Sequence, residues 1–448
     1  MSAGAKTTPA LGPQTIRQHE ASQKKGLDHV AHLRDILSFE NENSNVIGTL
    51  LEELAVPHRR TERWKYSPVG GFWKEHKPVA CVTIADSACE AQPVPGLDAY
   101  RLVFVNGTFD PSASDLPIAA GVVCMPLSEA VRSGLVQREI SSVERSDWFA
   151  ALNGQFAGEG MYLAVEKAVE LDRPVLIHQR QQGAGVPTFL RHVIELGAHA
   201  QAQVVNWSSA SSDASGSVNT LTEVHVGEQA VFTLDKVQDE SGEVHHLAFE
   251  AVDQAANSTF KIHTMTIQGA WVRNDLQICL SGQGCDAYLN GIFLPTGKEF
   301  VDNHTTVDHR EAHCTSSESY KGILYGQSTG VFNGKVFVRP DAQQTNAYQQ
   351  NANILGSRQA TMNAKPELEI YADDVKCSHG CTIGQFDDEA LFYARSRGIG
   401  EDEAKAMLVH AFIGDVIDGI AIPEVAMEVR HRLSEKHDWD RWDDANLL

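Results

Sequence analysis

The sequence has little positive charge. Its 448 residues include 37 Lys and Arg against 59 Asp and Glu, a formal net charge of −22. No basic run offsets this deficit beyond the pairs at residues 24–25 and 59–60. A chain of this charge repels a phosphate backbone, so we do not expect nucleic acid as a partner.

Long apolar runs and paired cysteines are also missing. No stretch reaches the roughly eighteen apolar residues of a membrane-spanning helix, and residues 1–23 lack the apolar centre of a secretory signal. The eight cysteines have no regular spacing and form no C-x-x-C pair, which argues against a disulfide framework or a zinc ribbon. We expect a protein of the reducing cytoplasm, not membrane-bound, with residues 1–23 as a disordered leader.

Short enzyme motifs are absent as well. The sequence contains no G-x-x-x-x-G-K-[ST] phosphate-binding loop and no G-x-S-x-G nucleophile elbow. Hydrolysis of ATP by this chain and serine-hydrolase chemistry therefore have no support.

Apolar periodicity divides the chain into three parts. Residues 24–185 read as a helical and mixed α/β region, and residues 381–448 as a helical domain. Between them, residues 186–380 alternate short strands with Gly, Asn and Ser, which is typical of a sandwich, barrel or solenoid. No strict repeat decides among these. Small or polar residues before apolar ones, at 197–200, 227–230 and 256–259, suit the tight corners of a β-helix.

Soft ligand types gather at the end of the β region. Cys377, His379 and Cys381 lie within five residues, and thiols with imidazole suit iron, zinc or copper. On a strand, Cys377 and His379 would face one way. The alternative is a buried cysteine beside a hydrogen-bonded turn histidine. Three His, one Cys and two Asp also fall within residues 302–314, but their spacing matches no metal motif and we favour a structural role.

Two segments resemble the same family. Residues 371–384, with 387–399 after them, resemble the C-terminal signature of SufD, a scaffold of the SufB/SufD family of iron–sulfur cluster assembly proteins. The Trp-Lys-Tyr-Ser-Pro segment at residues 64–68 is similar to its N-terminal hallmark. The resemblance implies a right-handed parallel β-helix core between a helical and mixed N-terminal region and a C-terminal helical domain.

The resemblance also implies a site. His379 matches a histidine at the interface with SufB, near a SufB cysteine, where a transient iron–sulfur cluster forms. His379 is thus expected as a metal ligand or proton donor shared with that cysteine. Cys377 matches a motif residue of less certain role, and Cys381 stands where the family has a small residue. No cofactor is expected on the isolated chain.

Partners follow from the same resemblance. The chain is expected to be a non-catalytic scaffold that pairs with SufB and binds the ABC-type ATPase SufC through residues 381–448. A homodimer of the free protein stays open. Docking candidates are Leu391, Phe392, Arg395, Arg397, Met407 and Leu408, although the stripe through Met407, Leu408, Ala411 and Phe412 reads first as core packing. The alternative function is a β-helix enzyme acting on acidic polysaccharide.

Overall fold

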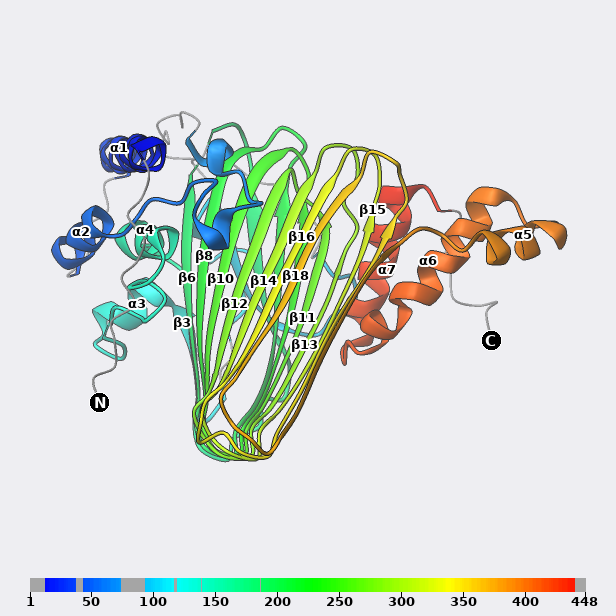
Figure 1. Cartoon of the computed structure of the whole chain (residues 1–448). Coiled ribbons are helices and arrows are strands. Elements are labelled where there is room, and N and C mark those ends of the chain that lie inside the picture. The colour runs from blue at the N-terminus through cyan, green and yellow to red at the C-terminus, as the bar shows by residue number, and fades with distance from the viewer. Residues whose placement is uncertain are drawn as a thin grey trace, which may run out of the picture.

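Two facing parallel sheets form the centre of the molecule (Figure 1). The computed structural model describes residues 13–37, 43–73, 93–116, 119–137, 139–185 and 187–439. From β4 onward, successive strands alternate between the two sheets, so the chain winds as a β-helix. The predicted parallel β-helix with helices on both sides is confirmed.

The two sheets are named here sheet A and sheet B. Sheet A contains, in spatial order, β19 (Val375–Gly384), β17 (Thr345–Leu355), β15 (Thr315–Leu324), β13 (Asp286–Phe293), β11 (Thr259–Gln268), β9 (Val231–Glu240), β7 (Gln201–Ala210), β5 (Val175–Gln181), β1 (Tyr100–Val105) and β2 (Thr108–Phe109). Sheet B contains β18 (Thr361–Ile370), β16 (Thr329–Val338), β14 (Phe300–His309), β12 (Trp271–Leu280), β10 (Glu243–Gln254), β8 (Ser215–Val226), β6 (Thr188–Leu196), β4 (Met161–Val165) and β3 (Val122–Pro126).

The solenoid begins before residue 186 and ends after residue 380, so both expected boundaries differ from the structure. β5 pairs in parallel with β1 and β7, and β4 pairs in parallel with β6. At the other end, β19 runs to Gly384. The early strands are short and separated by irregular segments, so their sequence shows strands without showing the sheet to which they belong. The Gln- and Asn-rich segment 343–353 contributes most of β17.

The corners expected at three places are stacked turns. His199, Gln229 and Asn257 each adopt a left-handed backbone, with φ of 61°, 56° and 56°. Each turn donates a backbone hydrogen bond to the next, from His199 N to Glu228 O and from Gln229 N to Ala256 O, at 2.8 and 2.9 Å. The repeated turn holds successive strands in register.

N-terminal elements pack on the outer face of sheet B. They are α1 (Pro13–Ile36), α2 (Ser44–Glu53), η1 (Glu62–Trp64), η2 (Val69–Trp73), α3 (Leu127–Arg132) and α4 (Trp148–Phe156). α1 begins at Pro13, so the expected disordered leader is wrong for residues 13–23, and residues 1–12 lie outside the described residues. Pro suits a first helical position, and the Gln23 amide bonds Leu54 O and Val56 N, each at 3.1 Å.

C-terminal helices cover part of the outer face of sheet A. They are α5 (Asp388–Ser396), α6 (Glu401–Asp418) and α7 (Pro423–His437). α6 buries Val409, Ile413, Val416 and Ile417, whereas Met407 is exposed and Leu408 half-buried. The core interpretation of the Met407 stripe is therefore right only in part: Phe412 packs against the buried cluster and Leu408 is half-buried, whereas Met407 and Ala411 are exposed. Within the described part of the chain, no helix is both long and apolar enough to cross a membrane.

The left-handed corner at Gln229 can be tested by its effect on the free energy of unfolding. Gln229→Val places a β-branched side chain at positive φ and should lower the free energy of unfolding by about 1–3 kcal/mol. Gln229→Gly should be tolerated. Urea unfolding measures both. Gln201→Val, at an exposed β7 position, is the matched control and should change little because valine favours strands. Equal losses for the two valine variants would contradict the argument.

Candidate functional site

The row Cys377, His379 and Cys381 lies on the last strand of the solenoid. β19 pairs with β17 and has no strand beyond it, so it ends sheet A. Its register places Cys377 beside Ala347, His379 beside Gln349 and Cys381 beside Asn351. Register partners in a parallel sheet point to the same face. Residues stacked in register through successive strands therefore form a column, and all three side chains continue columns that face the interior of the solenoid.

The side chains of these columns are buried on β17 and become exposed on β19. Ala347, Gln349 and Asn351 are at most 2% exposed, whereas His379 and Cys381 are exposed and Cys377 is half-buried. The end of the solenoid formed by β18 and β19, here called the open end, is therefore an interior surface that no further strand covers among the described residues. The strand geometry brings Cys377 and His379 to one face, as the sequence predicted, and adds Cys381 to them.

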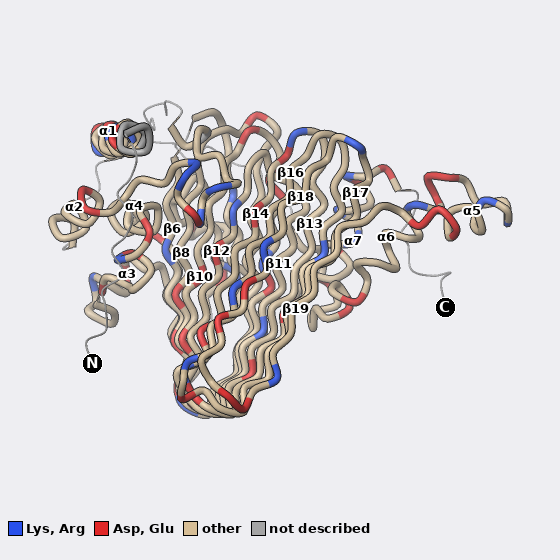
Figure 2. The backbone as a smooth tube through the Cα atoms, viewed as in Figure 1, with Lys and Arg blue, Asp and Glu red and all other residues tan. Residues whose placement is uncertain are grey.

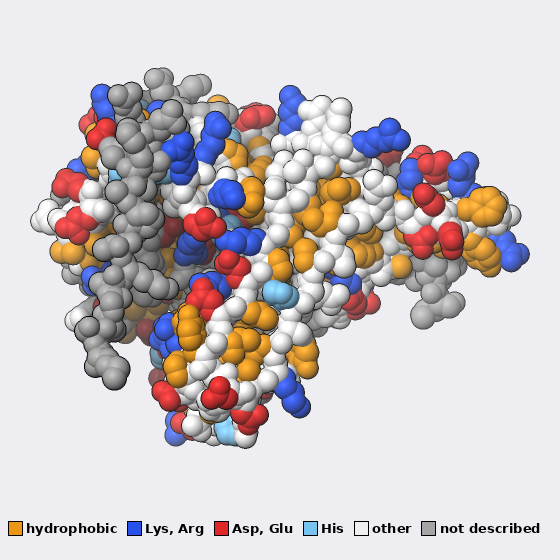
Figure 3. All heavy atoms as spheres, in the orientation of Figure 1, with side chains coloured by type: hydrophobic (Ala, Val, Ile, Leu, Met, Phe, Trp, Pro, Cys, Tyr) orange, Lys and Arg blue, Asp and Glu red, His pale blue; other side chains and the backbone are white. Residues whose placement is uncertain are grey.

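Apolar side chains surround this row. Cys377 packs with Leu368 of β18 against the buried Val336 and Val338, and Ile370 and Ile383 are 40% and 48% exposed. Figure 3 shows hydrophobic side chains gathered on the face where β18 and β19 end the solenoid. Two uncovered edge strands with an apolar lining are typical of a surface that pairs with another chain.

The two thiols of the row lie in surroundings that disfavour their ionised form. Burial raises the pKa of Cys377 and the pKa of Cys381, and a thiol must lose its proton to ligate. A neutral imidazole needs no such loss. Among the described residues, no three His, Cys, Asp or Glu side chains come together as a metal site. His379 thus stands on β19 without a preformed set of three such ligands among the described residues.

The residues of the 302–314 segment point apart. Asp302 and His304 face outward from β14, while His309 is buried against Ser316 Oγ at 2.9 Å. His313 occupies a corner with φ of 62°, and Cys314 donates to Gly282 O. This segment forms turns of the β-helix, so the structural interpretation is confirmed.

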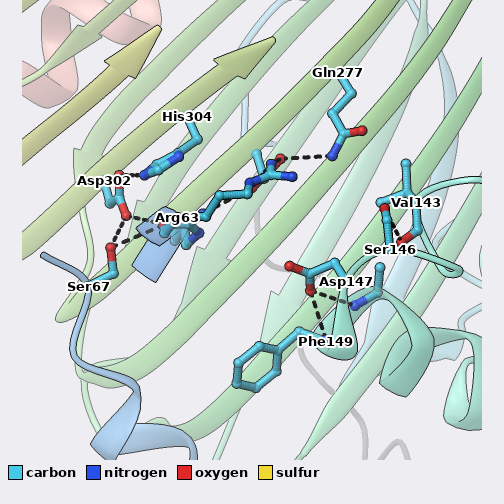
Figure 4. A network of polar contacts seen from close by, with 12 residues as sticks. Arg63, Ser67, Val143, Ser146, Asp147, Phe149, Gln277, Asp302 and His304 are labelled. Atoms are coloured by element: carbon cyan, nitrogen blue, oxygen red, sulfur yellow. Dashed lines mark hydrogen bonds and ion pairs between the residues drawn. The ribbon is translucent and has the colours of Figure 1, made fainter. Parts of the chain in front are cut away.

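The Trp-Lys-Tyr-Ser-Pro segment anchors the N-terminal part to sheet B. The Arg273 guanidinium lies 4.0 Å from the Trp64 ring centre and 2.5 Å from Asp302. Figure 4 shows Ser67 and His304 pointing toward the same Asp302 carboxylate, to which both bond. The sequence indicated an aromatic loop against the first helices. It did not predict Arg273 as a partner, because Arg273 is distant from this segment in the sequence.

Asp275 is a second buried carboxylate in the same cluster. Arg63, Arg273, Asp275 and Asp302 are together called the anchor. Arg63 binds both oxygens of Asp275 at 2.6 and 2.8 Å, and Arg273 binds it at 3.0 Å. Burial acts to raise the pKa of Asp275, but Arg63 and Arg273 outweigh it and hold that pKa below its ordinary value. The ion pairs therefore stabilise the docked segment while Asp275 is ionised.

A groove of about 330 Å³ beside this anchor has mixed charge. Lys365 pairs with Glu62 and Glu367, and Lys335 pairs with Glu369. Figure 2 shows basic and acidic residues interspersed across the strands, not separated by sign. The Glu62, Glu367 and Glu369 carboxylates are thus all paired with lysine side chains.

Two family models together match residues 41–412 of the chain. Residues 178–412 match the family described as SUF system FeS cluster assembly, SufBD core domain, and residues 41–177 match the SufBD protein N-terminal region. The chain belongs to the SufB/SufD family of iron–sulfur cluster assembly proteins. The resemblance seen at residues 64–68 and 371–399 is thereby confirmed, and the family core begins within β5.

Individual relatives cover most of the chain. Iron–sulfur cluster assembly protein SufD of Escherichia coli is 30% identical over 388 residues, 85% of this chain and 89% of the relative. A SufBD family protein of Synechocystis is 28% identical over 403 residues, 86% of this chain and 88% of the relative. SufD of Bacillus subtilis is 23% identical over 284 residues, 62% of this chain and 64% of the relative. The chain is thus SufD-like within its family.

The anchor predicts a large effect of one substitution. Arg273→Met leaves two buried carboxylates without their shared cation and should lower the free energy of unfolding at neutral pH by about 3–5 kcal/mol. A depressed pKa of Asp275 contributes stability above its unfolded value, which is lost as pH falls through the folded value. The difference between variant and parent should therefore shrink below about pH 4.

Urea unfolding at several pH values measures this difference. Arg339→Met, which breaks a more exposed pair with Asp308, is the matched control and should cost under about 1 kcal/mol. A loss for Arg273→Met no larger than that of the control would contradict the role of the anchor.

Proposed function

We propose that this chain is the SufD-type scaffold subunit of an iron–sulfur cluster assembly complex, with the cluster as cargo and no turnover of its own. In this proposal it pairs with SufB through the open end of the β-helix. His379 then contributes an imidazole to the site where the nascent cluster forms. The observation that carries the proposal is the uncovered row on β19, in which His379 stands between two thiols on an interior surface.

The edge strands favour a partner of the same fold. β18 and β19 each have ten residues and each ends its sheet. A second β-helix can extend both sheets by strand addition and cover the apolar lining in the same step. SufB is the partner proposed here, and a second copy of this chain uses the same edges when SufB is absent.

The ligand chemistry favours a shared site. Iron–sulfur clusters are held mainly by thiolates, sometimes with histidine in their place. In this proposal the chain supplies the His379 imidazole, and thiolate ligands come from SufB. The exposed Cys381 thiol also fits a protein that works in a reducing compartment such as the cytoplasm.

The C-terminal domain is the proposed docking site for the SufC ATPase. α5 buries none of its residues, and it extends away from the solenoid (Figure 1). Phe392 is 75% exposed and Tyr393 61%, while Arg395 binds Glu401 at 3.4 Å and Arg397 lies 3.3 Å from the Tyr393 hydroxyl. An exposed aromatic side chain flanked by arginines is typical of interface residues. Leu391, Met407 and Leu408 extend this surface.

His379→Ala should lower the cluster yield of the assembled complex at least several-fold while leaving assembly intact. The measurement is anaerobic iron and sulfide reconstitution of the chain with SufB and SufC, followed by iron content and visible absorption. His431→Ala, at an exposed α7 position, is the matched control and should behave as the parent. If the isolated chain holds stoichiometric iron that survives His379→Ala, the cluster site lies elsewhere.

Phe392→Asp should weaken binding of the SufC ATPase by about tenfold or more, because a charge replaces an exposed aromatic anchor. Met427→Asp on α7 changes another exposed apolar residue and should bind normally. Titration calorimetry with purified SufC measures both affinities. An unchanged affinity for the Phe392 variant would remove α5 from the docking surface.

A further inference from the structure

The interior column beneath His379 contains two polar residues. Glu318 on β15 is the register partner of Gln349 on β17, and Gln349 is the register partner of His379 on β19. Before them the same column contains Leu289 of β13. The column thus changes from apolar to polar two strands before the open end, although Glu318 and Gln349 are only 4% and 2% exposed.

The two polar side chains are joined. Gln349 Nε2 donates to Glu318 Oε2 at 2.8 Å. Burial raises the pKa of Glu318 to about 7, and its contacts with Thr305 and Gln349 act in the opposite direction. Gln349 Oε1 is buried and has no hydrogen-bond partner among the described residues. A buried acceptor in this state costs free energy unless a donor reaches it.

A glycine of the opposite sheet makes room for this arrangement. A Cβ atom on Gly334 of β16 would lie 2.2 Å from Gln349 Nε2 and 2.8 Å from its Cδ. Any larger residue at position 334 would displace the amide. Glu318 and Gly334 therefore fix the amide group of the residue that pairs in register with His379, and the amide oxygen is left without a partner among the described residues.

We propose that Gln349, held by Glu318, positions the His379 imidazole by accepting a hydrogen bond from the N–H of one ring nitrogen. Accepting from one ring nitrogen leaves the lone pair of the other for a metal, the arrangement in which ligating histidines commonly donate to a carbonyl or carboxylate. Gln349 and Glu318 are positioning residues that touch no iron. The inference rests on the proposed function of His379 and adds how the ring is oriented.

The test reads the tautomer of His379 in the full chain, without partners or iron. Nitrogen-15 shifts of the labelled imidazole are recorded at about pH 8, where an ordinary imidazole is neutral, and His379→Ala assigns the signals. The parent should show one dominant tautomer. Gln349→Leu should shift the tautomer ratio by about fivefold, the factor that corresponds to one net hydrogen bond.

Two pairs of variants separate positioning from general packing. Glu318→Gln keeps an acceptor for Gln349 and should retain the parent ratio, whereas Glu318→Leu should not. Gly334→Ala should shift the ratio because it moves Gln349. Gly330→Ala on the same strand, whose Cβ would lie near Met362 and Leu324, should leave the ratio unchanged at a comparable cost in stability.

The outcomes distinguish this inference from the proposed function. An even mixture of tautomers in the parent, or an unchanged ratio in Gln349→Leu and Gly334→Ala, overturns the positioning role even if His379→Ala abolishes cluster formation. A shifted ratio together with full cluster yield for His379→Ala supports the hydrogen bond and refutes the ligand role. Lower cluster yields in the variants with a shifted ratio support both.

Discussion

In-register stacking of parallel strands is the constraint on which the rest of the structure depends. The stacked corners at His199, Gln229 and Asn257 keep each strand aligned with the one before it. As a result, a side chain keeps its column through many turns, and each column ends on β18 or β19. The chemistry at the open end is thus set by residues distant in sequence, which lie beneath it in the same column.

The outer faces of the two sheets show a different requirement. Each sheet binds its helices through an apolar cluster and through ion pairs, which include Arg273 with Asp275 and Asp302 on sheet B and Lys321 with Asp415 of α6 on sheet A. Buried ion pairs contribute less to stability than apolar packing but fix the position of what they hold. In this chain they hold the Trp64 segment, so that family hallmark is explained by docking and requires no catalytic role.

The sequence predicted the strand geometry around His379 better than the limits of the solenoid. Two side chains two residues apart on a strand must share a face, so Cys377 and His379 were paired from sequence alone. The start of the solenoid was missed because β4 and β5 look like any short strands until their partners are known. α6 was misread in part because a stripe through Met407 and one through Val409 both fit a helical period. Glu318 and Gln349 carried no signal, since only register brings them beneath His379.

Short connections link the two proposed binding surfaces. β19 ends at Gly384 and α5 begins at Asp388, where the Asp387 side chain caps the helix by accepting from Glu389 N and Ala390 N. Three residues therefore separate the strand of His379 from the helix proposed to bind the ATPase. A hinge motion of α5 relative to β19 therefore has only residues 385–387 in which to bend, and the capping residue Asp387 already belongs to the start of the helix.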